Sequence, residues 1–312
     1  MDSRVGRDAE RRIRTYHEVS DPAGEDVLAQ VGAQERRLAG RLERIGRIVA
    51  VASGKGGVGK SAVAANLAAA LAQGGHRVGA ADADLNGPSL ARMLGAKGPL
   101  RVRQGGVEPA TGAAGVRVVS MDLLLSASDA PVRWKGPAAG GFIWQSTLET
   151  GALREFLSDV AWGELDILLI DAPPGTDKLA RLLELLPRLD TLVLVTTPSG
   201  MAGAVVARSV RLARETGAQE IGLVANMTAY RCPHCGVEEP LYAADGARAL
   251  AEAAGLELWA EIPFEPALAA ATDAGRPWIL EAAGAVDGSP ACRALQSLAG
   301  RLAGGMSGEG SG

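Results

Sequence analysis

The chain has 312 residues, of which 47% are hydrophobic and 22% charged, and a formal net charge of −4. This is an ordinary profile for a globular protein of one large or two average domains, and its negative charge disfavours a general nucleic-acid binder. No apolar run approaches the roughly 20 residues of a membrane span, and the charged N-terminus lacks the apolar segment of a signal peptide. We therefore expect a cytoplasmic protein that binds neither membrane nor nucleic acid.

The first 46 residues are rich in Arg and Glu. The stretch AQERRLAGRLERIG places Leu38, Leu42 and Ile45 near one face of a possible helix. We interpret residues 1–46 as a charged, partly helical extension, for which a solvated lead-in is the favoured interpretation. A domain over residues 47–304 and a flexible, glycine-rich tail over residues 305–312 are expected to follow.

Apolar, β-branched runs alternate with Ala- and Leu-rich helical stretches from residue 47 onward. Continuous apolar strands separated by helices are typical of a parallel sheet covered on both faces. The predicted fold is therefore α/β, a doubly wound, mostly parallel sheet with helices on both faces. The runs predicted as strands are RIVAVA, RVGAAD, VRVVSM, DILLID, TLVLVTT, EIGLVAN and LELWAEI.

The first of these runs leads into GKGGVGKS and then into a predicted helix. This is the G-x-x-x-x-G-K-[S/T] pattern of a phosphate-binding P-loop, in the strand–loop–helix context that it requires. Glycines allow backbone N–H groups to approach phosphate oxygens, and the helix N-terminus adds its dipole. Lys60 would reach the β- and γ-phosphates, and Ser61 would ligate Mg²⁺. The predicted loop residues are Gly54, Lys55, Gly56, Gly57, Val58, Gly59, Lys60, Ser61 and Ala62.

The additional lysine, Lys55, makes the loop K-G-G-x-G-K-S, which resembles the deviant Walker A ATPases: MinD, ParA, the nitrogenase iron protein and the Mrp/ApbC iron–sulfur carriers. Further stretches resemble the Mrp/ApbC group in the right order, over about residues 47–300. They are DADLNGPSLARMLG, the segment from VRWKGP to APPGT, LVANMTAYRCPHCG and AEIPFEPALAAATDAGRPW. The resemblance implies the P-loop NTPase fold and an ATP-binding, ATP-hydrolysing iron–sulfur cluster carrier.

In this family the additional lysine contacts the nucleotide of the partner subunit. Lys55 is thus expected to act catalytically across a homodimer, with Lys60 and Asp84 acting within one chain. The alternative for Lys55 is a surface lysine beside a polyanion.

Aspartates at two strand ends complete the expected Mg²⁺–ATP site. Asp84 would orient the attacking water and Asp82 would support the metal side, although two aspartates that cap the next turn are the alternative. Asp171, which ends DILLID, would hold Mg²⁺ through water. Gly175 in APPGT would approach the γ-phosphate as part of a switch loop. In this chain Asp177 follows Thr176 directly, so that loop is one residue shorter than the family pattern.

Two more residues are expected at the nucleotide base. Asn226, at the end of EIGLVAN, would bind the adenine edge, with an Asx-turn as the alternative. Pro263, in the stretch IPF, would line the adenine pocket by resemblance alone.

The segment CPHCG carries two of the three cysteines, Cys232 and Cys235. The third, Cys292, is expected to be a buried helical residue, and His234 is expected to point away from the pair. A four-thiolate site then needs a second copy of the chain, and the resemblance implies one [4Fe–4S] cluster bridging a homodimer. A zinc site or an unoccupied pair is the alternative.

Three classes of function remain in competition. The first is the iron–sulfur carrier, which would deliver its cluster to apo iron–sulfur proteins. The second is a MinD- or ParA-like positioning ATPase, although the glycine-diluted C-terminus lacks an amphipathic membrane helix and the net charge disfavours DNA binding. A nitrogenase-type reductase ranks lowest, because its cysteines are placed differently.

Overall fold

A computed structural model describes residues 27–103, 106–123, 150–151, 153–154, 156–200, 202–243, 245–281 and 289–304. The strands are β1 (Ile45–Ala52), β2 (Val78–Asp82), β3 (Arg101–Arg103), β4 (Gly106–Glu108), β5 (Ala110–Thr111), β6 (Arg117–Val119), β7 (Leu165–Asp171), β8 (Thr191–Thr196), β9 (Glu220–Arg231), β10 (Glu238–Pro240) and β11 (Glu257–Phe264). The helices are α2 (Val27–Leu42), α3 (Lys60–Gln73), α4 (Leu90–Met93), α6 (Thr176–Leu185), α7 (Gly203–Glu215), α8 (Gly246–Ala254), α9 (Pro266–Asp273), α10 (Trp278–Glu281) and α11 (Pro290–Gly304), with 3-10 turns η1 (Ala113–Gly115) and η2 (Met121–Leu123).

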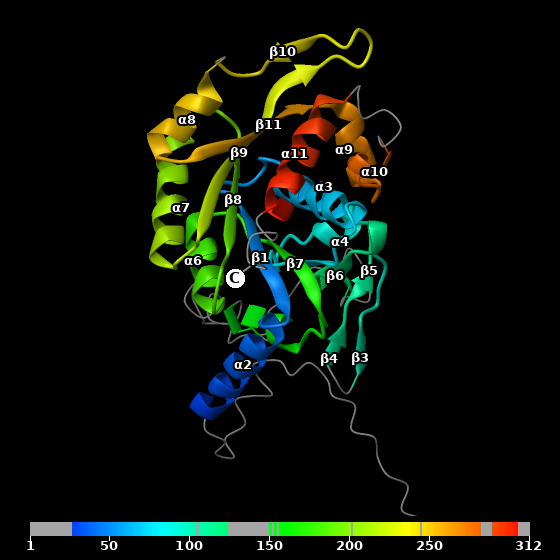
Figure 1. The fold of residues 1–312 in the computed structure, drawn as a ribbon, viewed down its shortest axis with the longest axis vertical. Coiled ribbons are helices and arrows are strands. Elements are labelled where there is room, and N and C mark those ends of the chain that lie inside the picture. The colour runs from blue at the N-terminus through cyan, green and yellow to red at the C-terminus, as the bar shows by residue number, and fades with distance from the viewer. Residues whose placement is uncertain are drawn as a thin grey trace, which may run out of the picture.

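The main sheet runs β10-β9-β8-β1-β7-β2-β6-β5, and β11 pairs with β9 (Figure 1). Pairing is parallel except at β10–β9 and β5–β6. One face packs on α2, α6, α7 and α8, and the other on α3, α4, α10 and α11. The central strands are buried on both faces, which explains why their sequences are continuous apolar runs. The predicted doubly wound α/β fold is confirmed.

Helix α2 is attached to the core more closely than a solvated lead-in would be. Its Leu38 and Leu42 are buried in the same cluster as Leu165 of β7, and Arg41 Nε donates to the carbonyl of Ser158 at 2.6 Å. Strand β1 begins at Ile45, before the expected boundary at residue 47. The sequence of the helix shows its apolar face but not the surface on which that face packs. That surface is the core beneath the sheet, which explains why α2 is attached and not solvated.

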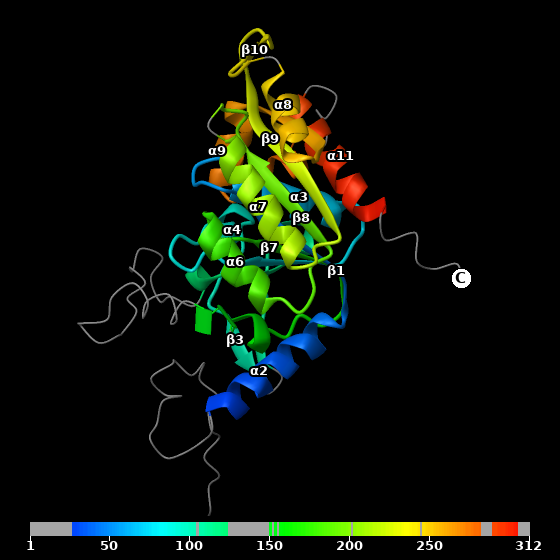
Figure 2. The same cartoon turned by 90° about the vertical axis from the view of Figure 1, so that its left-hand side faces the viewer.

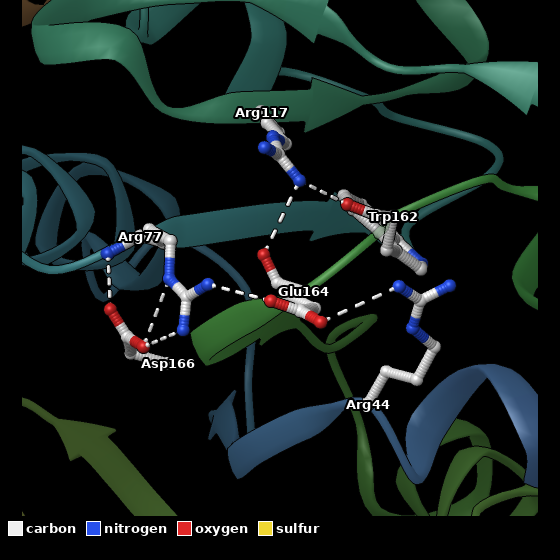
Figure 3. Close-up of polar contacts among 6 residues, drawn as sticks. All are labelled: Arg44, Arg77, Arg117, Trp162, Glu164 and Asp166. Atoms are coloured by element: carbon white, nitrogen blue, oxygen red, sulfur yellow. Dashed lines mark hydrogen bonds and ion pairs between the residues drawn. The ribbon is translucent and has the colours of Figure 1, made fainter.

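A charged cluster lies at the amino-terminal end of β7 (Figure 3). Arg77 pairs with Asp166 at 2.6 Å and with Glu164 at 3.1 Å, and Arg44 lies 3.6 Å from Glu164. Arg117 donates to the carbonyl oxygens of the loop before β7. These ion pairs are largely exposed, and pairs of this kind add little to stability because water and salt screen them. The cluster lies at the amino-terminal edge of the sheet, opposite to the edge that carries the P-loop. It is not part of the site described below.

The β9–β10 hairpin projects from one end of the long axis, and α2 lies at the other end (Figures 1 and 2). Strand β9 is longer than predicted: it continues past Asn226 to Arg231, beyond the edge of the sheet core, and turns back through β10. Three segments lie outside the described residues: residues 1–26, the WKGP segment and the tail over 305–312. The expectations for these segments stay predictions.

Candidate functional site

The P-loop connects β1 to α3 at the carboxyl edge of the sheet. Gly57 and Gly59 have φ values of 79° and 77°, which favour glycine over any residue with a Cβ. A Cβ on Gly59 would also lie only 2.3 Å from Nδ2 of Asn226. Val58 is buried between them, and Lys60 is the first residue of α3. The backbone therefore forms a glycine-rich turn on a helix N-terminus, the arrangement that phosphate binding requires.

Lys60 and Asp171 form a buried ion pair at the centre of the site. The Lys60 ammonium contacts Asp171 Oδ1 and lies 3.2 Å from Ser61 Oγ. The side chains are 7% and 0% exposed, and burial raises the pKa of Asp171 above its ordinary value despite the adjacent ammonium. The other carboxylate oxygen, Oδ2, is buried and has no hydrogen-bond partner. This carboxylate oxygen accepts no hydrogen bond and lies close to the Ser61 hydroxyl. Two such oxygen atoms are suitable ligands for Mg²⁺.

Asp82 lies beside Asp171 on the neighbouring strand. Its Oδ2 accepts the backbone N–H groups of Ser89 and Leu90 at 2.8 and 2.9 Å and the Ser120 hydroxyl at 3.2 Å. Burial and then the charge of Asp171 raise the pKa of Asp82 to about 7. These contacts hold the start of α4, as the capping alternative for Asp82 expects, and support of the metal side by Asp82 stays a prediction.

Asp84 is more accessible than Asp82 and is less tightly held. Its Oδ1 accepts the backbone N–H of Gly87 at a long 3.3 Å. Asp84 also lines a cavity of about 30 Å³ together with Pro173 of the switch loop and Lys178 and Arg181 of α6. The assignment of Asp84 to the attacking water stays a prediction, and its position facing the switch loop is compatible with it.

The switch loop is connected to the strand that carries the P-loop. The backbone N–H of Gly175 donates to Ser53 O at 3.3 Å, and Gly175 has a φ of 98°. Helix α6 begins at Thr176, directly after this glycine, with Asp177 in its first turn. The helix therefore starts without a spacer after the loop, and the shortening of this loop relative to the family pattern stays a prediction.

Asn226 contacts the P-loop directly. Its Nδ2 donates to Val58 O at 2.9 Å, and the side chain is buried. This is neither of the contacts that the sequence suggested, an adenine edge or an Asx-turn, and adenine binding by Asn226 stays a prediction. Pro263 is buried near the end of β11, next to the strand that carries Asn226.

Lys55 is exposed on the loop, unlike Lys60. Its ammonium lies 3.4 Å from Ser199 Oγ. Gly54 packs against α7, because a Cβ there would lie 1.9 Å from Val205 Cγ1. Ala62 continues the first turn of α3, where its carbonyl accepts the side-chain amide of Asn66 at 2.9 Å.

The thiol turn, Cys232 to Gly236, connects β9 to β10. Cys232 is half-buried and Cys235 is exposed. The backbone N–H of Gly236 donates to Cys232 O at 2.9 Å, which closes the turn. Hydrogen bonds from the backbone N–H groups of Cys235 and His234, and then from the Cys235 side chain, lower the pKa of the Cys232 thiol. A thiol with a lowered pKa in an exposed turn is suited to bind a metal.

The described part of the chain holds no group of three or more His, Cys, Asp or Glu side chains that could complete a metal site. Cys292 is buried in α11, and burial raises the pKa of its thiol. Its expected place in the core is confirmed.

Sequence reasoning missed several contacts that organise the site. They are Ser120 on Asp82, Ser199 on Lys55, and the pairing of Arg231 with Glu265. None follows a motif, because each depends on segments brought together only by the fold.

Within the described residues, no helix is both long and apolar enough to cross a membrane.

A P-loop on the first strand of a parallel sheet, with a buried Lys–Asp pair at the carboxyl edge, defines a P-loop NTPase. The family model described as "ParA: NUBPL iron-transfer P-loop NTPase" matches residues 44–303. The chain belongs to this family, within the MinD/ParA superfamily, and the resemblance seen in the motifs is confirmed.

Relatives agree with this assignment. The chain is 38% identical over 257 residues to an iron-sulfur cluster carrier protein of Saccharolobus solfataricus, covering 82% of this chain and 83% of the relative. It is 37% identical over 269 residues to the cytosolic Fe-S cluster assembly factor NUBP2 of Homo sapiens, covering 84% and 94%.

Solved structures show the same fold. A nucleotide-binding protein of Archaeoglobus fulgidus in complex with ADP is 36% identical, with a TM-score of 0.65, over 78% of this chain and 91% of that chain. The cell division ATPase MinD of Pyrococcus furiosus is 24% identical, with a TM-score of 0.56, over 83% and 99% of the two chains. The likeness to MinD shows the fold alone.

Proposed function

We propose that this protein is an ATP-hydrolysing iron–sulfur cluster carrier. Two copies of the chain would hold one [4Fe–4S] cluster between them and deliver it to apo iron–sulfur proteins. The observation that carries the proposal is the thiol turn: two cysteines, one exposed and one half-buried, at the end of a projecting hairpin, in a chain with a complete P-loop.

The nucleotide half of the proposal rests on the residues of the P-loop edge. Gly57 and Gly59 leave room for phosphate oxygens, and the N-terminus of α3 offers free N–H groups. Lys60 would exchange its contact with Asp171 for the β- and γ-phosphates of ATP. Ser61 and Asp171 would then hold Mg²⁺, which neutralises charge on the phosphates when bound. The structure of the Archaeoglobus fulgidus relative in complex with ADP supports nucleotide binding by this chain.

The cluster half rests on counting thiols. A [4Fe–4S] cluster takes four cysteine ligands, and each chain offers Cys232 and Cys235 on its turn. A two-fold axis near the hairpin would bring two identical turns together and supply four thiolates. Such a cluster is cargo held at a subunit boundary, so a shift of the subunits would release it. The names of the relatives, a carrier protein and a cytosolic assembly factor, support delivery to apoproteins in the cytoplasm.

Anaerobic reconstitution of the full chain with iron and sulfide tests the proposal. We expect cluster absorbance with four irons per dimer, and loss of that absorbance in Cys232→Ala and in Cys235→Ala with ATP binding intact. Cys292→Ala is the matched control, because its buried thiol is in the core, and it should keep the cluster.

Three results would contradict the proposal. They are a cluster retained without Cys232, a cluster on a single chain, or a protein that takes zinc alone. The last result would favour the alternative, a positioning ATPase with a structural zinc or an unoccupied cysteine pair.

A further inference from the structure

Strand β9 runs from a residue that contacts the P-loop to the start of the thiol turn. Asn226 binds Val58 O of the P-loop at 2.9 Å, and Cys232 follows six residues later, directly after the strand ends at Arg231. Six residues of extended chain span about 20 Å. One strand therefore contacts the phosphate-binding backbone at one point and carries the thiols at its end.

The strand is irregular between these two points. Ile262 of β11 pairs with Asn226, but Phe264, only two residues later, pairs with Tyr230, so β9 carries two extra residues there. Met227, just after Asn226, has a φ of 56°, which is unusual for a residue with a side chain. A bulge bends a strand and interrupts its ladder of hydrogen bonds. This segment is thus the place where β9 can change shape between the P-loop and the turn.

Beyond the bulge, side chains attach the hairpin to a fixed part of the core. The rings of Tyr230 and Phe264 stack at 6.4 Å between centroids. Arg231 Nη1 lies 3.9 Å from Glu265 Oε1. A Cβ added to Gly236 of the thiol turn would lie 3.8 Å from Arg231 Nη2, so the guanidinium is also close to the turn. The Arg231 guanidinium thus lies between Glu265 and the turn.

Glu265 itself is held firmly. Its side chain is 8% exposed, and its carboxylate accepts the Ser289 hydroxyl at 2.9 and 3.1 Å and the N–H of Ala291 at 3.0 Å. These partners are at the N-terminus of α11, where a negative charge is favourable. Glu265 is therefore attached to the start of α11 by several hydrogen bonds, and it lies two residues after Pro263.

We propose that Arg231 and Glu265 are positioning residues that transmit nucleotide binding at the P-loop to the thiol turn through β9. Nucleotide would fix the backbone around Val58, and the contact with Asn226 would pass this constraint to the bulge. The Arg231–Glu265 pair would convert this constraint on the bulge into a defined orientation of Cys232 and Cys235. The importance of this coupling for cluster transfer rests on the proposed function, but the coupling itself does not require a cluster.

Thiol alkylation of the metal-free full chain measures the coupling. Iodoacetamide modification of Cys232 and Cys235 would be followed by mass spectrometry with and without saturating Mg-ADP or Mg-ATP. We expect nucleotide to change the alkylation rate by roughly twofold to fivefold, the range that one partly exposed ion pair can supply. Arg231→Ala and Glu265→Gln should lose this dependence while nucleotide affinity is unchanged, and Arg231→Lys should keep it.

A matched control is Arg301→Ala, which removes the ion pair between Arg301 of α11 and Glu257 at the start of β11, together with the contact of Arg301 with the Trp259 ring. It should leave the dependence intact, because both contacts lie outside the thiol turn and the Arg231–Glu265 pair. The coupling is refuted if nucleotide-saturated wild type shows no change in rate, or if Arg231→Ala responds as wild type does. Glu265→Gln keeps the size of the side chain and one acceptor oxygen, so it provides the test if Arg231→Ala does not fold. Failure of cluster reconstitution with the alkylation response intact would reject the carrier function and leave the coupling.

Discussion

Asp82 is ionisable, nearly fully buried and adjacent to a second buried carboxylate, Asp171. Its pKa is raised from 3.8 to about 7 by burial and then by the charge of Asp171. The folded state therefore retains a proton that the unfolded chain releases above about pH 4. Stability from this group is greatest at low pH and falls as the pH rises toward 7.

We predict that Asp82→Asn flattens this dependence. The wild-type free energy of unfolding should fall between pH 5 and pH 7.5 by more than that of the variant, as measured by urea unfolding at both values. Asp166→Asn is the control, because hydrogen bonds from Arg77 lower the pKa of Asp166, so its effect is confined to more acidic solutions. Equal pH slopes in wild type and Asp82→Asn would show that Asp82 is ionised throughout this range.

At the scale of single residues, the sequence predicts site positions where a motif determines both the residue type and the backbone conformation. Gly59, Lys60 and Asp171 follow from the loop pattern and from the strand end, and the structure brings them together. The partners of Asp82 and Asn226 could not be predicted in the same way. Their contacts depend on which loop lies above which strand, and tertiary register decides that.

Among the elements, α2 shows most clearly that tertiary packing decides features that the local sequence does not predict. Leu42 is 1% exposed and joins the cluster beneath the sheet. Leu42→Ala should lower the free energy of unfolding by about 2–5 kcal/mol, the usual cost of removing a buried leucine side chain. Glu35→Ala, on the exposed face, should change it by less than about 0.5 kcal/mol. Urea unfolding measures both, and a small loss for Leu42→Ala would mean that the helix is detached in solution.

The long strands were predictable because burial on both faces produces apolar runs that stand out, such as DILLID in β7. The extension of β9 and the short partner β10 were not, because "EEP" carries no strand pattern and its pairing depends on Tyr230 and Arg231 across the turn. The bulge at Met227 is invisible in sequence for the same reason. It exists only relative to the register of β11.

At the level of the whole molecule, the proposed mechanism requires two chains for both of its sites. Lys55 is exposed and 3.4 Å from Ser199 Oγ, whereas Lys60 is buried beside Asp171. We propose different tasks for the two lysines of this loop: Lys60 would bind the nucleotide of its own chain, and Lys55 would contact the nucleotide of a neighbouring chain.

We predict that Lys55→Ala keeps the ADP affinity of wild type and lowers ATP turnover by about 100-fold or more, because it removes one charged contact to the transition state. Lys60→Ala should lose nucleotide affinity itself, as isothermal titration with ADP would show. Loss of ADP affinity in Lys55→Ala comparable to that in Lys60→Ala would place Lys55 in its own chain's site.

Mixing the two inactive variants separates action within a chain from action across the interface. In a mixed dimer, the Lys55→Ala chain retains its own Lys60 and receives Lys55 from the Lys60→Ala partner, so one site is complete. Equal mixing should restore about a quarter of wild-type turnover, because half of the dimers are mixed and each holds one complete site of two. If Lys55 acted only within its own chain, no pairing of the variants could assemble a complete site. Turnover of the mixture would then equal the average of the two variants, and the case for a nucleotide-linked dimer would be lost.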